Sequence, residues 1–173
     1  AKRVLEIFKE MSQIPRESGN EKGISDYIVN FAKNLGLEVH QDDQYNVVIK
    51  KPASPGYENR PSIILQGHID MVCVRDHDSN HDFTKDPIAN IIEGEWMHAD
   101  HTTLGADNGM GGAMMLAILE DDSQQHGPMQ LLFTTNEETG MDGAFAIKEG
   151  QVSGDYLLNL DTEVEHDFTV SCA

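Results

Sequence analysis

The feature that most constrains the fold of this chain is a series of apolar runs that alternate with helix-like segments. The runs "SIILQ", "MQLLFTT" and "DYLLNL" are almost continuously apolar. Strands buried on both faces have this composition, and their alternation with helices favours parallel strands joined by crossovers. The sequence therefore predicts an α/β fold with a largely parallel sheet sandwiched by helices.

The remaining elements follow from local periodicity. Apolar residues recur at helical spacing over residues 4–11, ending before Pro15, and over residues 24–35, ending at Gly36. Further helices are predicted in "NGMGGAMMLAILED" and "DGAFAIKE". "LEVHQD" and "NVVIKK" indicate strands, and "IANIIEGEWMHA" indicates a hairpin with a turn near Gly94.

Charge and length limit the classes of function. The chain has 173 residues, enough for one domain with a core, and 30 acidic against 12 basic residues give a formal net charge of −18. This charge argues against nucleic acid and anionic membranes as partners. No apolar run reaches the roughly 18 residues of a membrane span, and "AKRVLEIFKEM" lacks the apolar block of a signal peptide. We therefore expect a cytoplasmic protein.

Side chains capable of chemistry directly follow three of the apolar strands. His68 closes one strand, Glu137 and Glu138 follow the second closely, and Asp161 follows the third. Ligands of parallel α/β sheets bind at the carboxyl ends of the strands. This shared placement is the main indication of a functional site.

His68 and Asp70 lie two residues apart, so on a strand they would share a face. On its own such a pair is more often an incidental hydrogen-bonded or exposed one. In the functional interpretation, His68 is a metal ligand and Asp70 holds its other ring nitrogen.

Glu137, Glu138 and Asp107 each have a structural and a chemical interpretation. Adjacent glutamates commonly begin a helix; alternatively, one binds a metal while the other accepts a proton from metal-bound water. "TTLGADNGMGG" lacks the lysine and spacing of a phosphate loop, which excludes nucleotide binding. In the structural interpretation, Asp107 or Asn108 caps the helix that follows. In the chemical interpretation, Asp107 bridges two metal ions.

Other candidate sites are less convincing. "DHDSNHD" imitates a calcium loop, but His81 takes the glycine position and Pro87 the position of the bidentate glutamate, so a solvated loop is predicted. Cys73 and Cys172 are expected to be reduced, buried thiols. Surface or hydrogen-bonded positions are expected for His40, His77, His81, His98, His101, His126 and His166.

In order, "GHIDMVC", "TTLGADNG", "TTNEETGMDGA" and "LLNLDTE" resemble the metal-site motifs of the co-catalytic zinc aminopeptidases of the M20 clan. The resemblance is close to the aminoacyl-histidine dipeptidases, also called cytosolic Xaa-His dipeptidases or bacterial carnosinases. "PRESGNEKGISDY" and "DFTKDPI" extend it over nearly the whole chain. It implies a zinc-exopeptidase-like catalytic domain that hydrolyses carnosine-like Xaa-His dipeptides.

Carried over to this sequence, the resemblance implies a site that binds two divalent metal ions, and zinc is the expected metal. It implies that His68 and Asp161 bind one zinc, that Glu138 binds the other and that Asp107 bridges them. Asp70 becomes the partner that orients His68. Imidazole and carboxylate ligands also suit manganese and cobalt.

The resemblance also implies the mechanism. A bridging water loses its proton to the general base Glu137 and attacks the peptide carbonyl polarised by the metals, and the same glutamate then protonates the leaving amine. Asp107 and Asn108 would share a cis peptide bond. Two departures from the family pattern are His101, where relatives tend to have glycine, and Asn136, where they tend to have aspartate. The first would add a metal donor, and the second directly precedes the general base Glu137.

The family pattern also predicts the domain organisation. Residues 1–173 would be the N-terminal part of the catalytic domain, without the lid or dimerisation domain and without the C-terminal part that carries a further histidine ligand. We therefore expect at most one firmly held zinc and little or no peptidase activity from the chain alone, and a homodimer for the intact protein. Missing C-terminal strands would leave a sheet edge or an apolar face uncovered, which favours self-association.

Other functions are compatible with the same residues. An aminoacylase, tripeptidase or carboxypeptidase of the same clan would use the same metal residues on a small peptide or acylated amino acid. A non-catalytic domain that retains the fold is the alternative from another class. The intact set of metal and base positions argues against it.

Overall fold

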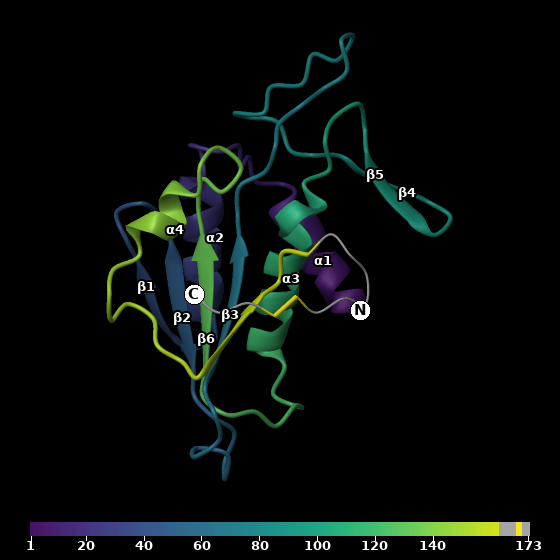
Figure 1. The fold of residues 1–173 in the computed structure, drawn as a ribbon. Coiled ribbons are helices and arrows are strands. Elements are labelled where there is room, and N and C mark those ends of the chain that lie inside the picture. The colour runs from purple at the N-terminus through teal and green to yellow at the C-terminus, as the bar shows by residue number, and fades with distance from the viewer. Residues whose placement is uncertain (163–168, 171–173) are drawn as a thin grey trace.

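The computed structural model describes residues 1–162 and 169–170, and it forms a central sheet with helices packed against it (Figure 1). The elements in chain order are α1 (Lys2–Met11), α2 (Lys22–Asn34), β1 (Glu38–Gln41), β2 (Val47–Lys51), β3 (Ile63–His68), β4 (Asn90–Glu93), β5 (Trp96–Ala99), α3 (Ala106–Glu120), β6 (Met129–Thr134), α4 (Asp142–Ala146) and β7 (Tyr156–Asn159). Every predicted helix and strand is present. None of the helices in the described residues has the length and apolar character needed to cross a membrane.

The five-stranded sheet has the order β1-β2-β6-β3-β7. The three strands β6, β3 and β7 run parallel, as predicted. β2 instead pairs antiparallel with β6, and β1 pairs antiparallel with β2. The short connection over residues 42–46 explains the second of these pairings, because only antiparallel neighbours can be joined by so few residues.

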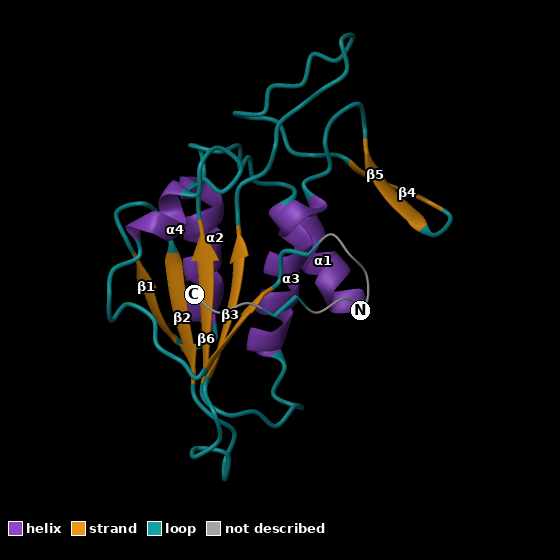
Figure 2. Cartoon of the chain, in the orientation of Figure 1, coloured by secondary structure: helices purple, strands orange, loops and turns teal. Residues whose placement is uncertain are grey.

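The core lies mainly on one face of the sheet, where α2 and α3 pack on the strands and α1 packs on α3 (Figure 2). Phe8, Ile28, Met115 and Phe133 are fully buried there. The amphipathic spacing of α1 and α2 places their apolar residues on this side. α2 ends at Asn34, and Gly36, which follows the C-cap residue Leu35, adopts a left-handed backbone conformation with φ of 71°.

The other face of the sheet has a smaller cluster, formed by Val48, Ile64 and Leu132. It is packed by Ile147 and Val152 from the segment that follows α4. This helix is shorter than the predicted "DGAFAIKE" because Ile147 is already extended, with ψ of 125°. Loop residues therefore cover much of the face where the sequence predicted a helix.

Two parts of the described chain are exposed. β7 is an edge strand paired only with β3, and Tyr156, Leu157 and Leu158 are 62%, 54% and 45% exposed. The antiparallel β4–β5 hairpin projects away from the main sheet (Figure 1), and its Trp96 is 79% exposed.

Candidate metal centre

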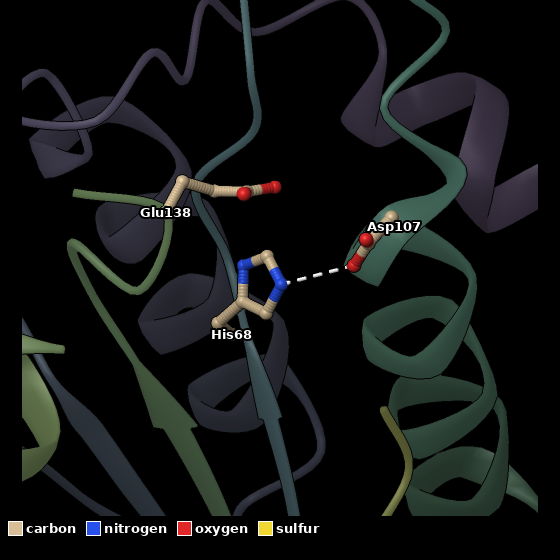
Figure 3. A group of neighbouring side chains, drawn as sticks. All are labelled: His68, Asp107 and Glu138. Atoms are coloured by element: carbon tan, nitrogen blue, oxygen red, sulfur yellow. Dashed lines mark hydrogen bonds and ion pairs between the residues drawn. The ribbon is translucent and has the colours of Figure 1, made fainter. Parts of the chain in front are cut away.

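The residues that follow the parallel strands converge at one end of the sheet. His68 is the last residue of β3, Asp107 lies in the first turn of α3, and Glu138 follows β6; their metal-binding atoms lie within 4.8 Å of one another (Figure 3). His68 Nε2 lies 3.1 Å from Asp107 Oδ1 and 3.7 Å from Asp161 Oδ2. Parallel neighbours bring their carboxyl ends together, which explains the convergence.

The imidazole of His68 is buried and oriented by Asp70. His68 is 1% exposed and Asp70 is fully buried, and His68 Nδ1 lies 3.1 Å from Asp70 Oδ1. With Nδ1 engaged, Nε2 faces the carboxylates of the site. The predicted contact between the two residues is confirmed, and it is the arrangement in which a carboxylate fixes a metal-binding histidine.

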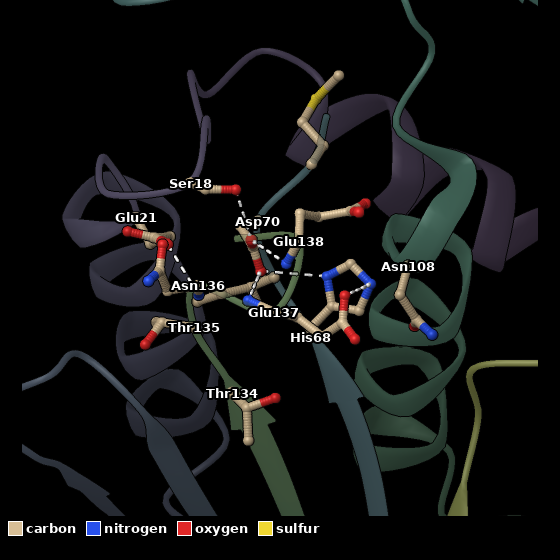
Figure 4. Close-up of polar contacts among 12 residues, drawn as sticks. Ser18, Glu21, His68, Asp70, Asn108, Thr134, Thr135, Asn136, Glu137 and Glu138 are labelled. Atoms are coloured by element: carbon tan, nitrogen blue, oxygen red, sulfur yellow. Dashed lines mark hydrogen bonds and ion pairs between the residues drawn. The ribbon is translucent and has the colours of Figure 1, made fainter. Parts of the chain in front are cut away.

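Asp70 also holds the glutamate loop, which the sequence did not predict. Its Oδ1 accepts a hydrogen bond from the main-chain N–H of Glu137 at 3.1 Å, and its Oδ2 accepts one from Glu138 at 3.2 Å (Figure 4). The hydroxyl of Ser18 donates a further bond to Oδ2 at 2.7 Å. Ser18 was missed because no local pattern links the loop after α1 with the end of β3.

Glu137 and Glu138 lie in a turn, and α4 begins only at Asp142. The interpretation that the pair begins a helix is therefore wrong. Glu137 Oε2 lies 3.9 Å from His68 Nε2, so both side chains of the pair come near the imidazole. Burial and the neighbouring carboxylates raise the pKa of Glu138, although the charge of His68 opposes this shift.

The start of α3 is irregular at the site. The peptide bond between Asp107 and Asn108 is cis, as the family resemblance implied, and neither residue has helical backbone angles. Asn108 Nδ2 donates to the carbonyl of Leu160 at 2.9 Å, which joins this turn to the residue before Asp161. Neither Asp107 nor Asn108 forms a side-chain cap bond to the helix that follows: Asp107 Oδ1 lies beside His68, and Asn108 Oδ1 has no hydrogen-bond partner among the described residues.

The two departures from the family pattern lie outside the metal-binding group. His101 is exposed, and its Nδ1 lies 2.7 Å from Asp76 Oδ2. Its φ of 56° belongs to the left-handed region that glycine adopts easily. The amide of Asn136 donates to Asp142 at 2.7 Å and accepts from Thr139 at 2.6 Å.

The structure tests the buried-thiol prediction for one of the two cysteines. Cys73 is only half-buried, contrary to the predicted buried thiol, because it lies in the loop that leaves the sheet after β3. Burial still raises the pKa of this thiol to about 11. Cys172 and His166 lie outside the described residues.

Protonation of His68 and Asp70 makes the metal-free site sensitive to pH. Burial opposes protonation of His68, but the hydrogen bond and charge of Asp70, with the charge of Asp161, raise its pKa to about 9. Burial likewise opposes ionisation of Asp70, but the bonds from His68, Ser18 and the two loop amides lower its pKa to about 2. The metal-free site thus contains a buried ion pair at neutral pH.

We expect the free energy of unfolding of the metal-free chain to be highest between about pH 4 and pH 6.5. The raised histidine pKa stabilises the folded state below its unfolded value of about 6.5, and this contribution of roughly 3 kcal/mol is lost as the pH rises to 9. The lowered pKa of Asp70 gives a contribution that is lost as the pH falls from about 4 towards 2. Urea unfolding with a chelator at each pH measures both.

The matched control for this pH dependence is His77→Ala, since the side chain of His77 is fully exposed. That variant should keep the alkaline loss of stability, whereas His68→Asn should remove it. Equal stability of the unsubstituted chain at pH 6.5 and pH 9 would contradict the assignment.

Comparisons with known proteins identify the family of this chain. The model of peptidase family M20/M25/M40 matches residues 64–170, more than half of the chain. The cytosol non-specific dipeptidase of Escherichia coli is 46% identical over 168 residues, covering 97% of this chain and 35% of that protein. The crystal structure of aminoacylhistidine dipeptidase from Vibrio alginolyticus matches with a TM-score of 0.91 and 47% identity, covering 94% of this chain and 33% of that chain.

A more distant structural relative is a tripeptidase from Staphylococcus aureus, with a TM-score of 0.79 and 26% identity over 94% of this chain and 44% of that chain. The chain spans about a third of the length of the two dipeptidases. The matched region contains β3, α3 and β6, the elements that carry His68, Asp107 and the glutamate pair. From the family match together with this shared fold, the chain belongs to peptidase family M20/M25/M40.

Proposed function

We propose that this chain forms the N-terminal part of the catalytic domain of a metal-dependent dipeptidase that hydrolyses Xaa-His dipeptides. The observation that carries the proposal is the grouping of one buried imidazole with the carboxylates of Asp107, Glu138 and Asp161 at the end of the sheet. Glu137, the proposed base, lies beside the same imidazole.

The donor set fits a divalent transition metal. Imidazole nitrogen and carboxylate oxygen are ligands that zinc accepts, and they also suit manganese and cobalt. His68, Asp161 and Asp107 would give a first zinc three protein ligands, whereas Asp107 and Glu138 alone would serve a second. We therefore propose one firmly held metal in this chain and a second that needs a further ligand.

The role proposed for Glu137 follows from its position. Its carboxylate is 35% exposed, so a water and a peptide substrate can approach it. It would accept a proton from the water that attacks the peptide carbonyl and donate a proton to the amine nitrogen as the C–N bond breaks. A bound metal would supply Lewis-acid polarisation of the carbonyl and ease deprotonation of the water. The buried Asp70, which contacts the imidazole of His68 and the main-chain N–H of Glu137, would hold both residues in place during the two proton transfers.

Substrate choice is tested on the full-length protein with four classes of compound. We expect Xaa-His dipeptides to be hydrolysed with the highest kcat/KM, ahead of dipeptides without histidine, tripeptides and N-acylated amino acids. The second candidate, another amidohydrolase of the family, is favoured by the structural likeness to a tripeptidase. Preferred cleavage of a tripeptide or an acylated amino acid would replace the Xaa-His assignment, and cleavage of none would favour a non-catalytic domain.

We propose a small peptide as the ligand, no nucleic-acid or membrane partner, a cytoplasmic location and a homodimer for the intact protein. The chain alone should also self-associate, because among the described residues β7 has an edge without a partner strand and exposes Leu157 and Leu158. Sedimentation velocity should show concentration-dependent association that Leu158→Lys weakens. A monomer at all concentrations would contradict the expected association.

A further inference from the structure

The loop between α1 and α2, residues 12–21, contacts the segments that carry His68, Asp107 and the Glu137–Glu138 pair. We propose that Arg16 and Glu21 in this loop are positioning residues that hold Asp107 and the Glu137–Glu138 pair around His68. The inference rests on the proposed function of that site. Both residues precede the region matched by the family model, and neither touches the metal-binding group directly.

Arg16 joins the end of β3 to the start of α3. Its side chain is 3% exposed, and Nη1 donates to the carbonyl oxygens of Ile69 at 3.2 Å and Asp70 at 3.1 Å. Nη2 donates to the carbonyl oxygen of Gly105, two residues before Asp107. One guanidinium therefore fixes the distance between the strand that ends at His68 and the turn that carries Asp107.

The glycines on either side of Asp107 are fitted to this guanidinium. A Cβ added to Gly105 would lie 2.4 Å from Arg16 Nη2, and one added to Gly109 would lie 2.6 Å from the same atom. Gly105 also has a φ of 70°. The glycine pattern of "TTLGADNG" thus has a physical cause, namely the close approach of Arg16 on both sides of the cis peptide.

The positively charged guanidinium of Arg16 is buried among neutral carbonyl groups. Within the part of the chain that the structure describes, its donors meet only main-chain carbonyls and form no ion pair. Burial lowers the pKa of Arg16 to about 10, against the charges of Asp70 and Asp107. A buried guanidinium without a paired carboxylate is costly, and hydrogen bonds to three carbonyls together with nearby negative charge offset that cost.

Glu21 holds the glutamate loop from the other side. Its side chain is 4% exposed, and Oε1 accepts a hydrogen bond from the main-chain N–H of Asn136 at 2.9 Å (Figure 4). The next two amides, of Glu137 and Glu138, donate to Asp70, and the preceding one, of Thr135, donates to Asn46.

Four consecutive amides of this loop, at residues 135–138, are therefore bound by buried side-chain oxygens from three separate segments. Fixing the backbone in this way leaves the carboxylates of Glu137 and Glu138 free to point towards His68. Loss of one acceptor would leave a buried N–H unsatisfied and let the loop shift.

Amide hydrogen exchange of the metal-free 173-residue chain tests this inference directly. In Glu21→Met, exchange at the amides of residues 136–138 should be at least about tenfold faster, because the acceptor is lost with little change in volume. Glu21→Gln keeps an acceptor oxygen and should restore slow exchange. Arg16→Met should accelerate exchange at Met71, whose amide donates to the main-chain carbonyl of Arg16, and at Gly109, whose amide donates to the carbonyl of Gly105.

Arg16→Lys should fail to restore slow exchange, because one ammonium group cannot reproduce the planar fork. The control is Arg3→Met, which removes an arginine from α1 that pairs with Glu10 and Glu120. Unchanged exchange at residues 136–138 in a folded Glu21→Met chain would overturn the inference. If Arg16→Met does not fold, the comparison of Glu21→Met with Glu21→Gln still tests the inference.

Cobalt(II) binding separates this inference from the proposed function. Glu21→Met and Arg16→Met should weaken Co²⁺ binding roughly 10–100-fold, as loss of residues that orient metal ligands does elsewhere, while Glu21→Gln stays near the unsubstituted value. An unsubstituted chain that binds no Co²⁺ would count against the proposed metal site, and the exchange rates would still test positioning. Unaltered Co²⁺ affinity in both methionine variants would contradict positioning even where the metal binds.

Discussion

Replacing His68 with alanine is expected to abolish firm metal binding by this chain. The unsubstituted chain, loaded with zinc and desalted, should retain about one zinc ion, measured by elemental analysis. His68 supplies the only imidazole of the group, and its Nε2 lies between Asp107 and Asp161. Without it, the remaining donors are carboxylates alone, a set that binds zinc less well.

His77→Ala is the matched control for this loss, because it removes an imidazole that is fully exposed. It should leave the zinc content unchanged. Zinc retained at full stoichiometry by His68→Ala would mean that the metal is bound elsewhere. If the unsubstituted chain retains no zinc either, this chain cannot assemble the site alone. His68→Ala and His77→Ala would then be compared in the full-length protein.

Replacing Glu137 with glutamine should lower the kcat of the full-length protein by roughly 10²–10⁴-fold. Glutamine preserves the shape of the side chain but cannot accept the proton of the attacking water. Glu137 is outside the proposed ligand set, so the metal content should not change. Steady-state kinetics with an Xaa-His dipeptide and elemental analysis of the same sample measure the two effects.

Glu149→Gln provides the control for this variant, because Glu149 is an exposed glutamate of the same chain. It should keep the unsubstituted kcat. Full activity in Glu137→Gln would remove the general-base assignment, and loss of both activity and metal would instead make Glu137 a ligand.

The local sequence was sufficient to predict that His68, the glutamate pair and Asp161 would lie near one another. The apolar runs "SIILQ", "MQLLFTT" and "DYLLNL" marked strands, and a parallel arrangement brings their carboxyl ends to one edge. The position of His68 and of the glutamate pair along the chain was therefore enough to group them. The resemblance to the M20 motifs then supplied the individual roles, which remain proposals for this chain.

The contacts that orient these side chains could not be read in the same way. Ser18 and Asp70 are 52 residues apart, and Glu21 lies 115 residues from Asn136. No periodicity relates such distant positions. The glycine pattern around Asp107 was visible, but its cause, the close approach of Arg16, depends on how α1, β3 and α3 pack.

The sequence alone thus determined the kinds of element, their order and the strand-end placement of the candidate ligands, because these depend on periodicities of two and 3.6 residues within short segments. Only the tertiary structure decided that β6 lies between β2 and β3, that β2 runs antiparallel to it, and which buried oxygens hold the glutamate loop. The reason is physical. Strand order and buried hydrogen bonds are selected by packing over the whole core and by the cost of leaving polar groups unpaired, and neither quantity is encoded in any one stretch of chain.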